Sequence, residues 1–181
     1  MKKWIWLFAT VIILILFDIA VIFFLLSKTR NFLQCGCFPL GIVLHHSAGA
    51  GDARSIDEWH KTKGFGILYQ DKEYHIAYHY VILPDGRIQR GRPEKCKGAH
   101  VDRPLYNNFF LGICLIGDFS SSDNPDGRKG PKKPTPAQLK SLKMLIEGLK
   151  KKYHILMVKS HREINPDTEC PGDTLLEDLL M

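Results

Sequence analysis

The feature that most constrains this chain is an apolar run near its amino terminus, from Trp4 to Leu26, in which Asp18 is the only charged residue. The run has 23 residues, enough for a helix to cross a hydrocarbon core of about 30 Å. We therefore predict a transmembrane anchor in residues 1–30, with a long cleaved signal peptide as the alternative. Residues 31–40 are expected to form a juxtamembrane linker, and residues 41–181 one folded domain.

The charge of the chain is modest once the anchor is set aside. The net charge is +6, and residues 1–30 contribute +3 of it, from four basic residues against Asp18. The remaining charge of about +3 is scattered and not laid along one helix or arm, so we expect no nucleic-acid partner. Basic residues flank both ends of the apolar run, and the positive-inside rule therefore does not decide its orientation.

Alternating strand-like and helix-like segments predict an α/β domain with a mixed central sheet flanked by helices. Strands are expected at residues 42–46, 76–83, 87–90, 111–117 and 155–160. Helices are expected from a capping box at Ser55 to near Gly64, from Thr135-Pro136 to near Tyr153, and over residues 175–180. Residues 65–75, 91–110 and 120–134 are expected to be loops.

Cysteine usage leaves one question open. Cys114 lies in an apolar strand-like run and is expected to be a small core residue. Cys35 and Cys37 follow the apolar run, and Cys96 lies in a charged loop. In an oxidising compartment one of the first two could pair with Cys96, but sequence alone does not fix the pairing.

Two histidines and one cysteine form the most informative set of residues. The strand-like run 42–46 ends in His45 and His46, the run 155–160 is followed by His161, and Cys170 comes shortly after. Two imidazoles and one thiolate suit zinc, with a fourth position open to water as in catalytic zinc sites. Neighbouring strand residues point to opposite faces, so only one of His45 and His46 can easily face the metal. The apolar residues before them do not decide which.

Six segments occur in the order found in the amidase-2 family: IVLHHSAG, AYHYVILPDGRIQRGRP, GAH, YNNFFLGICLIGDF, TPAQLKSLKMLI and SHREINPDTECPG. The resemblance covers residues 40–178. The family comprises zinc-dependent N-acetylmuramoyl-L-alanine amidases, phage amidase-type lysozymes and peptidoglycan recognition proteins. The resemblance implies the mixed α/β fold of that family and its zinc cofactor.

The resemblance also implies which side chains would bind zinc. The implied ligands are His45, His161 and Cys170, with His46 turned toward packing or a hydrogen bond. Eight residues separate His161 from Cys170, where many relatives have seven, which indicates a one-residue insertion in this loop.

Four further residues match the family pattern around the substrate. Tyr78 would donate to the oxyanion or orient the water, and Thr168 would help to position the carbonyl. His100 and Asn107 would contact the substrate. The pair Phe109–Phe110 departs from the pattern, since relatives often have Asn-Ser there, and predicts a more apolar groove wall.

The implied activity is hydrolysis of the amide bond between N-acetylmuramic acid and L-alanine, with peptidoglycan or muropeptides as the substrate. We expect a monomer that is anchored in the membrane, with its catalytic domain (residues 41–181) on the extracytoplasmic side. One alternative is a recognition module that binds peptidoglycan without cutting it. The other is a structural zinc domain, which the missing fourth protein ligand disfavours.

Overall fold

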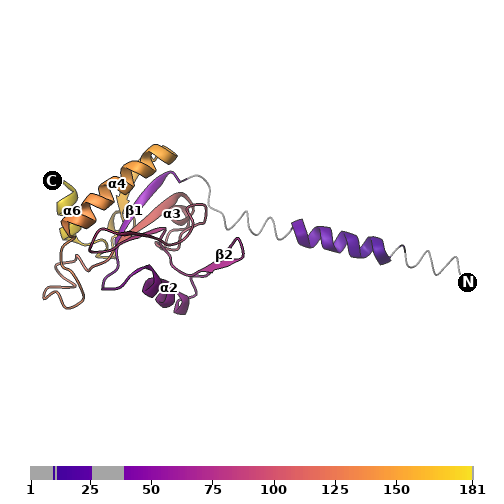
Figure 1. The fold of residues 1–181 in the computed structure, drawn as a ribbon, viewed down its shortest axis with the longest axis horizontal. Helices are drawn as coiled ribbons and strands as arrows, with labels where there is room; N and C mark the ends of the chain where they lie inside the picture. Colours follow the sequence, from indigo (N-terminus) through magenta and orange to yellow (C-terminus); the bar gives the residue numbers. More distant parts are fainter. Residues whose placement is uncertain (1–9, 11, 26–38, 181) are drawn as a thin grey trace, which may run out of the picture. The chain divides into compact units, whose positions relative to one another are not determined.

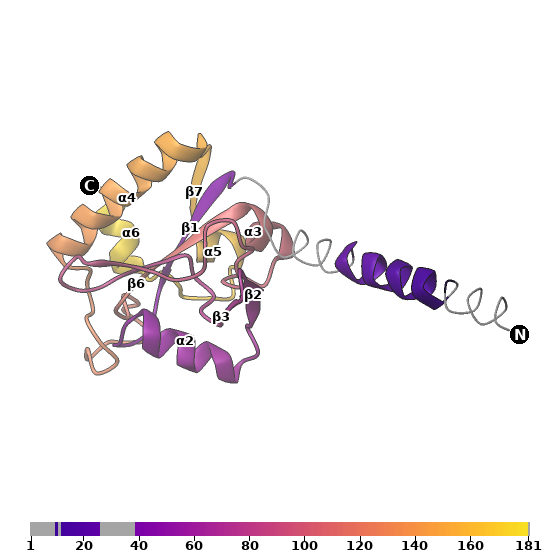
Figure 2. The same ribbon diagram turned by 45° about the vertical axis from the view of Figure 1, so that its right-hand side comes forward.

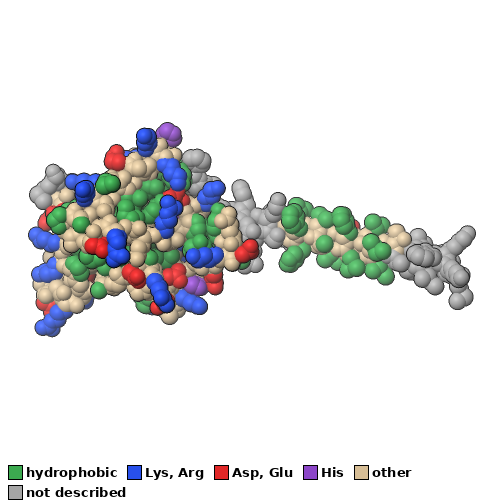
Figure 3. Space-filling view, in the orientation of Figure 1, with side chains coloured by type: hydrophobic (Ala, Val, Ile, Leu, Met, Phe, Trp, Pro, Cys, Tyr) green, Lys and Arg blue, Asp and Glu red, His purple; other side chains and the backbone are tan. Residues whose placement is uncertain are grey.

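A computed structural model describes residues 10, 12–25 and 39–180. The chain divides into two compact units, Met1–Gln34 and Cys35–Met181. In the first unit residues 12–25 are helical and carry exposed apolar side chains (Figure 3). Within the described residues we find no helix of sufficient length and apolarity to cross a bilayer. Parts of the predicted anchor (residues 1–9, 11 and 26–30) and most of the predicted linker (31–38) lie outside the described residues, and both stay predictions.

The second unit is built on a five-stranded mixed sheet in the order β5-β4-β6-β1-β7. Its strands are β1 (Gly41–His46), β4 (Tyr80–Ile82), β5 (Ile88–Arg90), β6 (Phe110–Leu115) and β7 (Met157–Ser160). Strand β1 lies between β6 and β7 and is parallel to both, whereas β4 is parallel to β6 and antiparallel to β5. The predicted α/β class with a mixed sheet is confirmed.

Helices cover both faces of this sheet (Figures 1 and 2). The helices are α2 (Ala53–Thr62), α3 (Pro104–Phe109), α4 (Pro136–Tyr153), α5 (His161–Ile164) and α6 (Asp173–Leu180). Apolar residues of α4 and α6 share one buried cluster with those of β1 and β6, and α2 packs on a second cluster with β4. On the face of the molecule in Figure 3, Lys and Arg side chains are interspersed with Asp and Glu.

Strand β1 sends alternate side chains into two different clusters. Ile42 and Leu44 pack with α4, whereas Val43 packs on the opposite face with Val101. Alternation along the strand therefore places His46 on the α4 face and His45 on the other. The side chains of the two adjacent histidines thus lie on opposite faces of the sheet.

Helix α2 begins earlier than the sequence predicted. The Asp52 carboxylate accepts the Ser55 N–H at 2.9 Å, and Ser55 Oγ accepts the Asp52 N–H at 2.8 Å. Asp52 is therefore the N-cap, and Ser55 is the third helical residue of the capping box. The prediction that Ser55 is the N-cap is therefore wrong, since Asp52 occupies that position.

The predicted strand 76–83 is shortened to the three residues of β4. The Ile76 N–H donates to the Asp57 carboxylate at 2.7 Å, and the Ala77 N–H donates to His60 Nδ1 at 3.0 Å. Because side chains of α2 take these backbone donors, residues 75–79 run as irregular backbone beside the helix.

Two predicted loops contain regular structure. Residues 65–75 include an antiparallel hairpin of β2 (Ile67–Tyr69) and β3 (Lys72–Tyr74). The predicted loop 91–110 contains α3, which starts at Pro104 and has no side-chain cap at its N-terminus. Neither element has the cap or the long apolar pattern on which the prediction depended.

Candidate metal centre

The structure brings His45, His161 and Cys170 together at the carboxyl end of β1. One possible ligand atom from each lies within 4.8 Å of the others. Leu44 of β1 is paired with Ser160, the last residue of β7. The residues that follow, His45 of β1 and His161 at the start of α5, are therefore neighbours, with ring centroids 4.8 Å apart. Cys170 Sγ lies 3.5 Å from His45 Nδ1.

The ring of His45 is oriented by His100. His100 Nε2 lies 3.1 Å from the carbonyl oxygen of Phe110, which can only accept, so this nitrogen carries the proton. His100 Nδ1 is then an acceptor, and His45 Nε2 donates to it at 3.0 Å. The lone pair of His45 Nδ1 is left facing the Cys170 sulfur. An outer partner on the second nitrogen is typical of metal-binding histidines.

The two histidines have the properties of metal ligands. His161 Nε2 is buried and has no hydrogen-bond partner within the part of the chain that the structure describes. A buried nitrogen without a partner is costly, and a bound cation would offset that cost. Burial lowers the pKa of His45 well below its usual value, and it also lowers the pKa of His161. Both rings are therefore neutral at pH 7, as metal binding requires.

Cys170 completes a donor set that fits zinc. Burial raises the pKa of its thiol to about 12, although the His46 N–H, 3.4 Å from the sulfur, opposes this rise. The thiol therefore stays neutral unless a nearby cation stabilises the thiolate. Two imidazole nitrogens and one sulfur form a donor set that binds zinc in preference to magnesium or calcium.

Arg162 closes the segment 161–170 on itself. Its backbone N–H donates to the Cys170 carbonyl at 2.9 Å, and its guanidinium donates to the backbone carbonyls of Thr168 and Glu169 at 3.4 and 3.2 Å. It also forms an ion pair with the Glu169 carboxylate. Two candidate ligands are thus held in one local unit. The sequence analysis missed Arg162. The only signal for this residue was its position next to His161 in the sequence.

Thr168 lies next to the candidate ligands. Its Oγ1 accepts the Cys170 N–H at 3.2 Å, which leaves the hydroxyl hydrogen for another acceptor. The side chain is partly exposed. Thr168 can therefore fix the Cys170 backbone and still donate to a group in the site.

Tyr78 lies on the other side of His45, with ring centroids 5.0 Å apart. Burial, together with the neighbouring Cys114 and Cys170, raises the pKa of its hydroxyl well above the usual value, so the hydroxyl remains a donor at neutral pH. His60 supports this segment, since its Nδ1 holds the Ala77 N–H and its ring centroid is 5.5 Å from that of Tyr78. The sequence analysis gave His60 no role.

Asn107, in α3, holds the loop that carries His100. Asn107 Oδ1 accepts the N–H groups of His100 and Val101 at 2.9 and 3.2 Å, and its Nδ2 donates to the Val101 carbonyl at 2.7 Å. His100 is 6% exposed and both of its ring nitrogens are hydrogen bonded. A Cβ at Gly112 would lie 2.7 Å from the His100 ring, so glycine leaves the room for it. In this arrangement a substrate contact from His100 would require its ring to turn.

The expectation of an apolar groove wall is wrong for Phe110. Its side chain is 7% exposed and packs in the core with Val43 and Val101. Phe109 is partly buried against the same cluster. These aromatic rings fill the space between β1 and the loop that carries His100.

The structure confirms the prediction for Cys114 and does not test the predicted pairing of Cys96. Cys114 is fully buried in β6, as expected of a core residue. Cys96 is buried as well. Its predicted alternatives as partner, Cys35 and Cys37, lie outside the described residues, so the pairing stays a prediction.

Comparisons with known proteins extend over this whole site. A sequence model of the N-acetylmuramoyl-L-alanine amidase family matches residues 37–173, which include every candidate site residue named above. The endolysin of Klebsiella phage KP32 is 31% identical over 119 residues, 66% of this chain and 68% of the endolysin. Peptidoglycan recognition protein 1 of Rattus norvegicus is 33% identical over 141 residues, 75% and 70% of the two chains. The structure of N-acetylmuramoyl-L-alanine amidase LysC from Clostridium intestinale URNW aligns with a TM-score of 0.63 and 34% identity, over 79% of this chain and 83% of LysC.

Proposed function

Because the chain belongs to the family of N-acetylmuramoyl-L-alanine amidases, we propose that it is a zinc-dependent hydrolase that cuts the amide bond between N-acetylmuramic acid and L-alanine in peptidoglycan. The observation that carries this proposal is the convergence of His45, His161 and Cys170, together with the buried Nε2 of His161, which has no hydrogen-bond partner among the described residues. A protein that only binds peptidoglycan has no need for such a set.

Contacts within the chain orient His45 and keep both candidate histidine ligands neutral. The hydrogen bond to His100 fixes His45 with its Nδ1 lone pair toward Cys170, and burial keeps both histidines neutral. When bound, zinc would supply a Lewis acid that polarises the amide carbonyl and lowers the pKa of a water molecule from about 15.7 toward 7. The backbone of His45 is held in the sheet, because β1 is paired on both sides, with β6 and with β7.

Tyr78 and Thr168 supply the donors that amide cleavage requires. Attack on an amide places negative charge on the carbonyl oxygen, and donors that are already in position stabilise that charge. The Tyr78 hydroxyl keeps its proton because its pKa is raised. The Thr168 hydroxyl is anchored through its oxygen to the Cys170 N–H, and its hydrogen remains available. We assign Tyr78 to the oxyanion and Thr168 to positioning of the carbonyl.

We also propose that the protein works as a monomer on the extracytoplasmic side of a membrane. The support for the membrane location is the apolar run 4–26 and the exposed apolar side chains of the helix at residues 12–25. Peptidoglycan lies outside the cytoplasmic membrane, so an anchor with this orientation would hold the enzyme near its substrate.

Mass spectrometry of reaction products tests the proposed activity. The full chain in detergent, loaded with zinc, should convert muropeptides into a free stem peptide with an N-terminal L-alanine and a peptide-free sugar. The same protein treated with a chelator should leave the muropeptides intact, and zinc should restore turnover. If the zinc-loaded protein binds muropeptides and releases no peptide, the proposal fails and peptidoglycan recognition is the function.

A further inference from the structure

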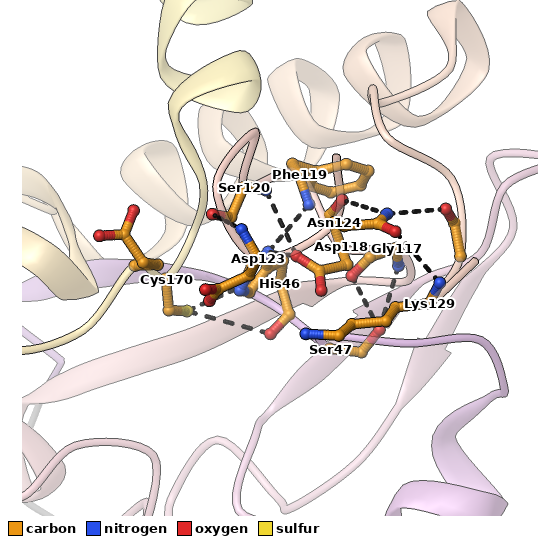
Figure 4. Close-up of polar contacts among 12 residues, drawn as sticks. His46, Ser47, Gly117, Asp118, Phe119, Ser120, Asp123, Asn124, Lys129 and Cys170 are labelled. Carbon is orange, nitrogen blue, oxygen red and sulfur yellow. Dashed lines mark hydrogen bonds and ion pairs between the residues drawn. The ribbon is translucent and has the colours of Figure 1, made fainter. Parts of the chain in front are cut away.

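The ring of His46 lies on the opposite face of the sheet from that of His45. The backbone of His46, however, contacts the Cys170 sulfur (Figure 4). His46 Nδ1 accepts the backbone N–H of Phe119 at 3.0 Å. His46 is 6% exposed, and its backbone N–H donates to Cys170 Sγ at 3.4 Å. One residue thus contacts the sulfur through its backbone and holds a second chain segment through its ring.

The backbone of Phe119 is the intermediate in this link. Its carbonyl oxygen accepts two hydrogen bonds from Thr174, from the backbone N–H at 3.2 Å and from Oγ1 at 3.0 Å. Gly172 lies directly against it, because a Cβ at Gly172 would be 2.2 Å from the Phe119 carbonyl carbon. The His46 ring therefore holds the N–H of Phe119, and the segment that follows Cys170 rests against the carbonyl group of the same residue.

We propose that His46 is a positioning residue that sets the Cys170 sulfur in place for zinc. The inference rests on the proposed function, since it assumes that Cys170 is a zinc ligand. The His46 ring fixes the backbone N–H of Phe119, Gly172 and Thr174 rest against the carbonyl group of Phe119, and Cys170 stands two residues before Gly172. Without the ring, the Phe119 N–H loses its acceptor and this support of the sulfur loosens. Residues that orient metal ligands typically contribute 10- to 100-fold to metal affinity.

A matched pair of variants tests the role of the ring acceptor. Asn and Leu have nearly the same shape, but only Asn can present an oxygen near the position of Nδ1. His46→Leu should weaken zinc binding about 10- to 100-fold, measured in the full chain by competition with a chelating dye. His46→Asn should bind zinc nearly as tightly as the wild type. In the cobalt-substituted proteins, the sulfur-to-cobalt charge-transfer band should weaken in His46→Leu and be kept in His46→Asn.

Gln138→Leu separates positioning from general stability. Gln138 is fully buried and donates to the carbonyl groups of Ile82 and Ile116, so its loss destabilises the same domain away from the candidate ligands. The Gln138→Leu substitution should lower the midpoint of thermal unfolding without changing the affinity for zinc. Thr174→Val, at the other end of the link, should weaken zinc binding in the same direction as His46→Leu.

Wild-type affinity and an unchanged cobalt–sulfur band in His46→Leu would overturn the inference. An equal loss of affinity in Gln138→Leu would do the same, because it would show that any destabilisation weakens the site. Absence of zinc binding in the wild-type chain would instead contradict the proposed function itself.

Discussion

His45 Nε2 donates to His100 Nδ1 at 3.0 Å, so the tautomer of a candidate zinc ligand on β1 is set by a residue on a distant loop. His100→Phe keeps a ring in the space beside Gly112 but removes the acceptor. We expect zinc affinity to fall about 10- to 100-fold, since outer partners of metal-bound histidines contribute that much. Competition with a chelating dye measures the change, and an unaltered affinity would show that His45 needs no partner.

Cys170→Ser should lose most of its zinc, because a hydroxyl is a far poorer zinc ligand than a thiolate. Elemental analysis of the purified variant measures the metal content against one zinc per wild-type chain. Cys114→Ser is the matched control, since Cys114 is also buried but is not part of the candidate cluster. Full zinc occupancy in Cys170→Ser would remove this residue from the ligand set.

Tyr78→Phe should keep zinc and muropeptide binding but reduce turnover about 10²- to 10³-fold, the usual cost of removing one oxyanion donor. Tyr80→Phe is the control. The Tyr80 hydroxyl donates to Glu94, so its loss should cost stability and leave turnover near the wild-type value. Equal turnover in Tyr78→Phe and the wild type would assign the oxyanion to another donor.

The metal-free protein should lose stability as the pH falls from 7.5 to 5. Burial lowers the pKa of both His60 and His79 to about 4, below the value of 6.5 for an unfolded histidine. The unfolded chain therefore takes up protons first, and stability is fully present above about pH 6.5 and falls until about pH 4. Each histidine contributes at most about 2 kcal/mol of this loss at pH 5.

Urea unfolding in the presence of a chelator measures this pH dependence. His60→Asn keeps an acceptor for the Ala77 N–H but cannot titrate, so its unfolding free energy should depend less steeply on pH than that of the wild type. A slope equal to the wild-type slope would mean that His60 is not held neutral in the folded protein.

The full-length protein should stay in the membrane fraction after high-salt and alkaline washing. Those treatments remove proteins held by surface charge but not a segment anchored by an apolar run such as 4–26. Amino-terminal sequencing checks the alternative. A soluble form that begins beyond residue 26 would identify a cleaved signal peptide.

Local signals predicted the parts of the fold that depend on local contacts. Thr135 Oγ1 caps α4 by accepting the Gln138 N–H at 3.0 Å, as its sequence pattern indicated. The apolar run before His45 predicted β1. Where a side chain distant in sequence takes over a backbone group, the prediction failed. Asp57 and His60 bind the backbone of residues 75–77 and shorten the predicted strand.

The candidate site shows the same division. The residue types and the family pattern singled out His45, His161 and Cys170, and the structure brings them together. Which nitrogen of His45 is free follows from its contact with His100, 55 positions away, and no local pattern contains that information. The role of Arg162 could not be read either, because it depends on how the loop folds back.

The closure made by Arg162 couples metal binding to the integrity of the carboxyl-terminal segment. Two candidate ligands, His161 and Cys170, belong to one closed stretch of chain, while His45 belongs to β1 of the sheet. If this stretch detaches, both ligands leave together, so zinc release and local unfolding become one event. The free zinc concentration would then set how often the segment opens, since a ligand that binds only the closed form stabilises it by mass action. Metal supply would thereby govern the resistance of residues 161–181 to proteases.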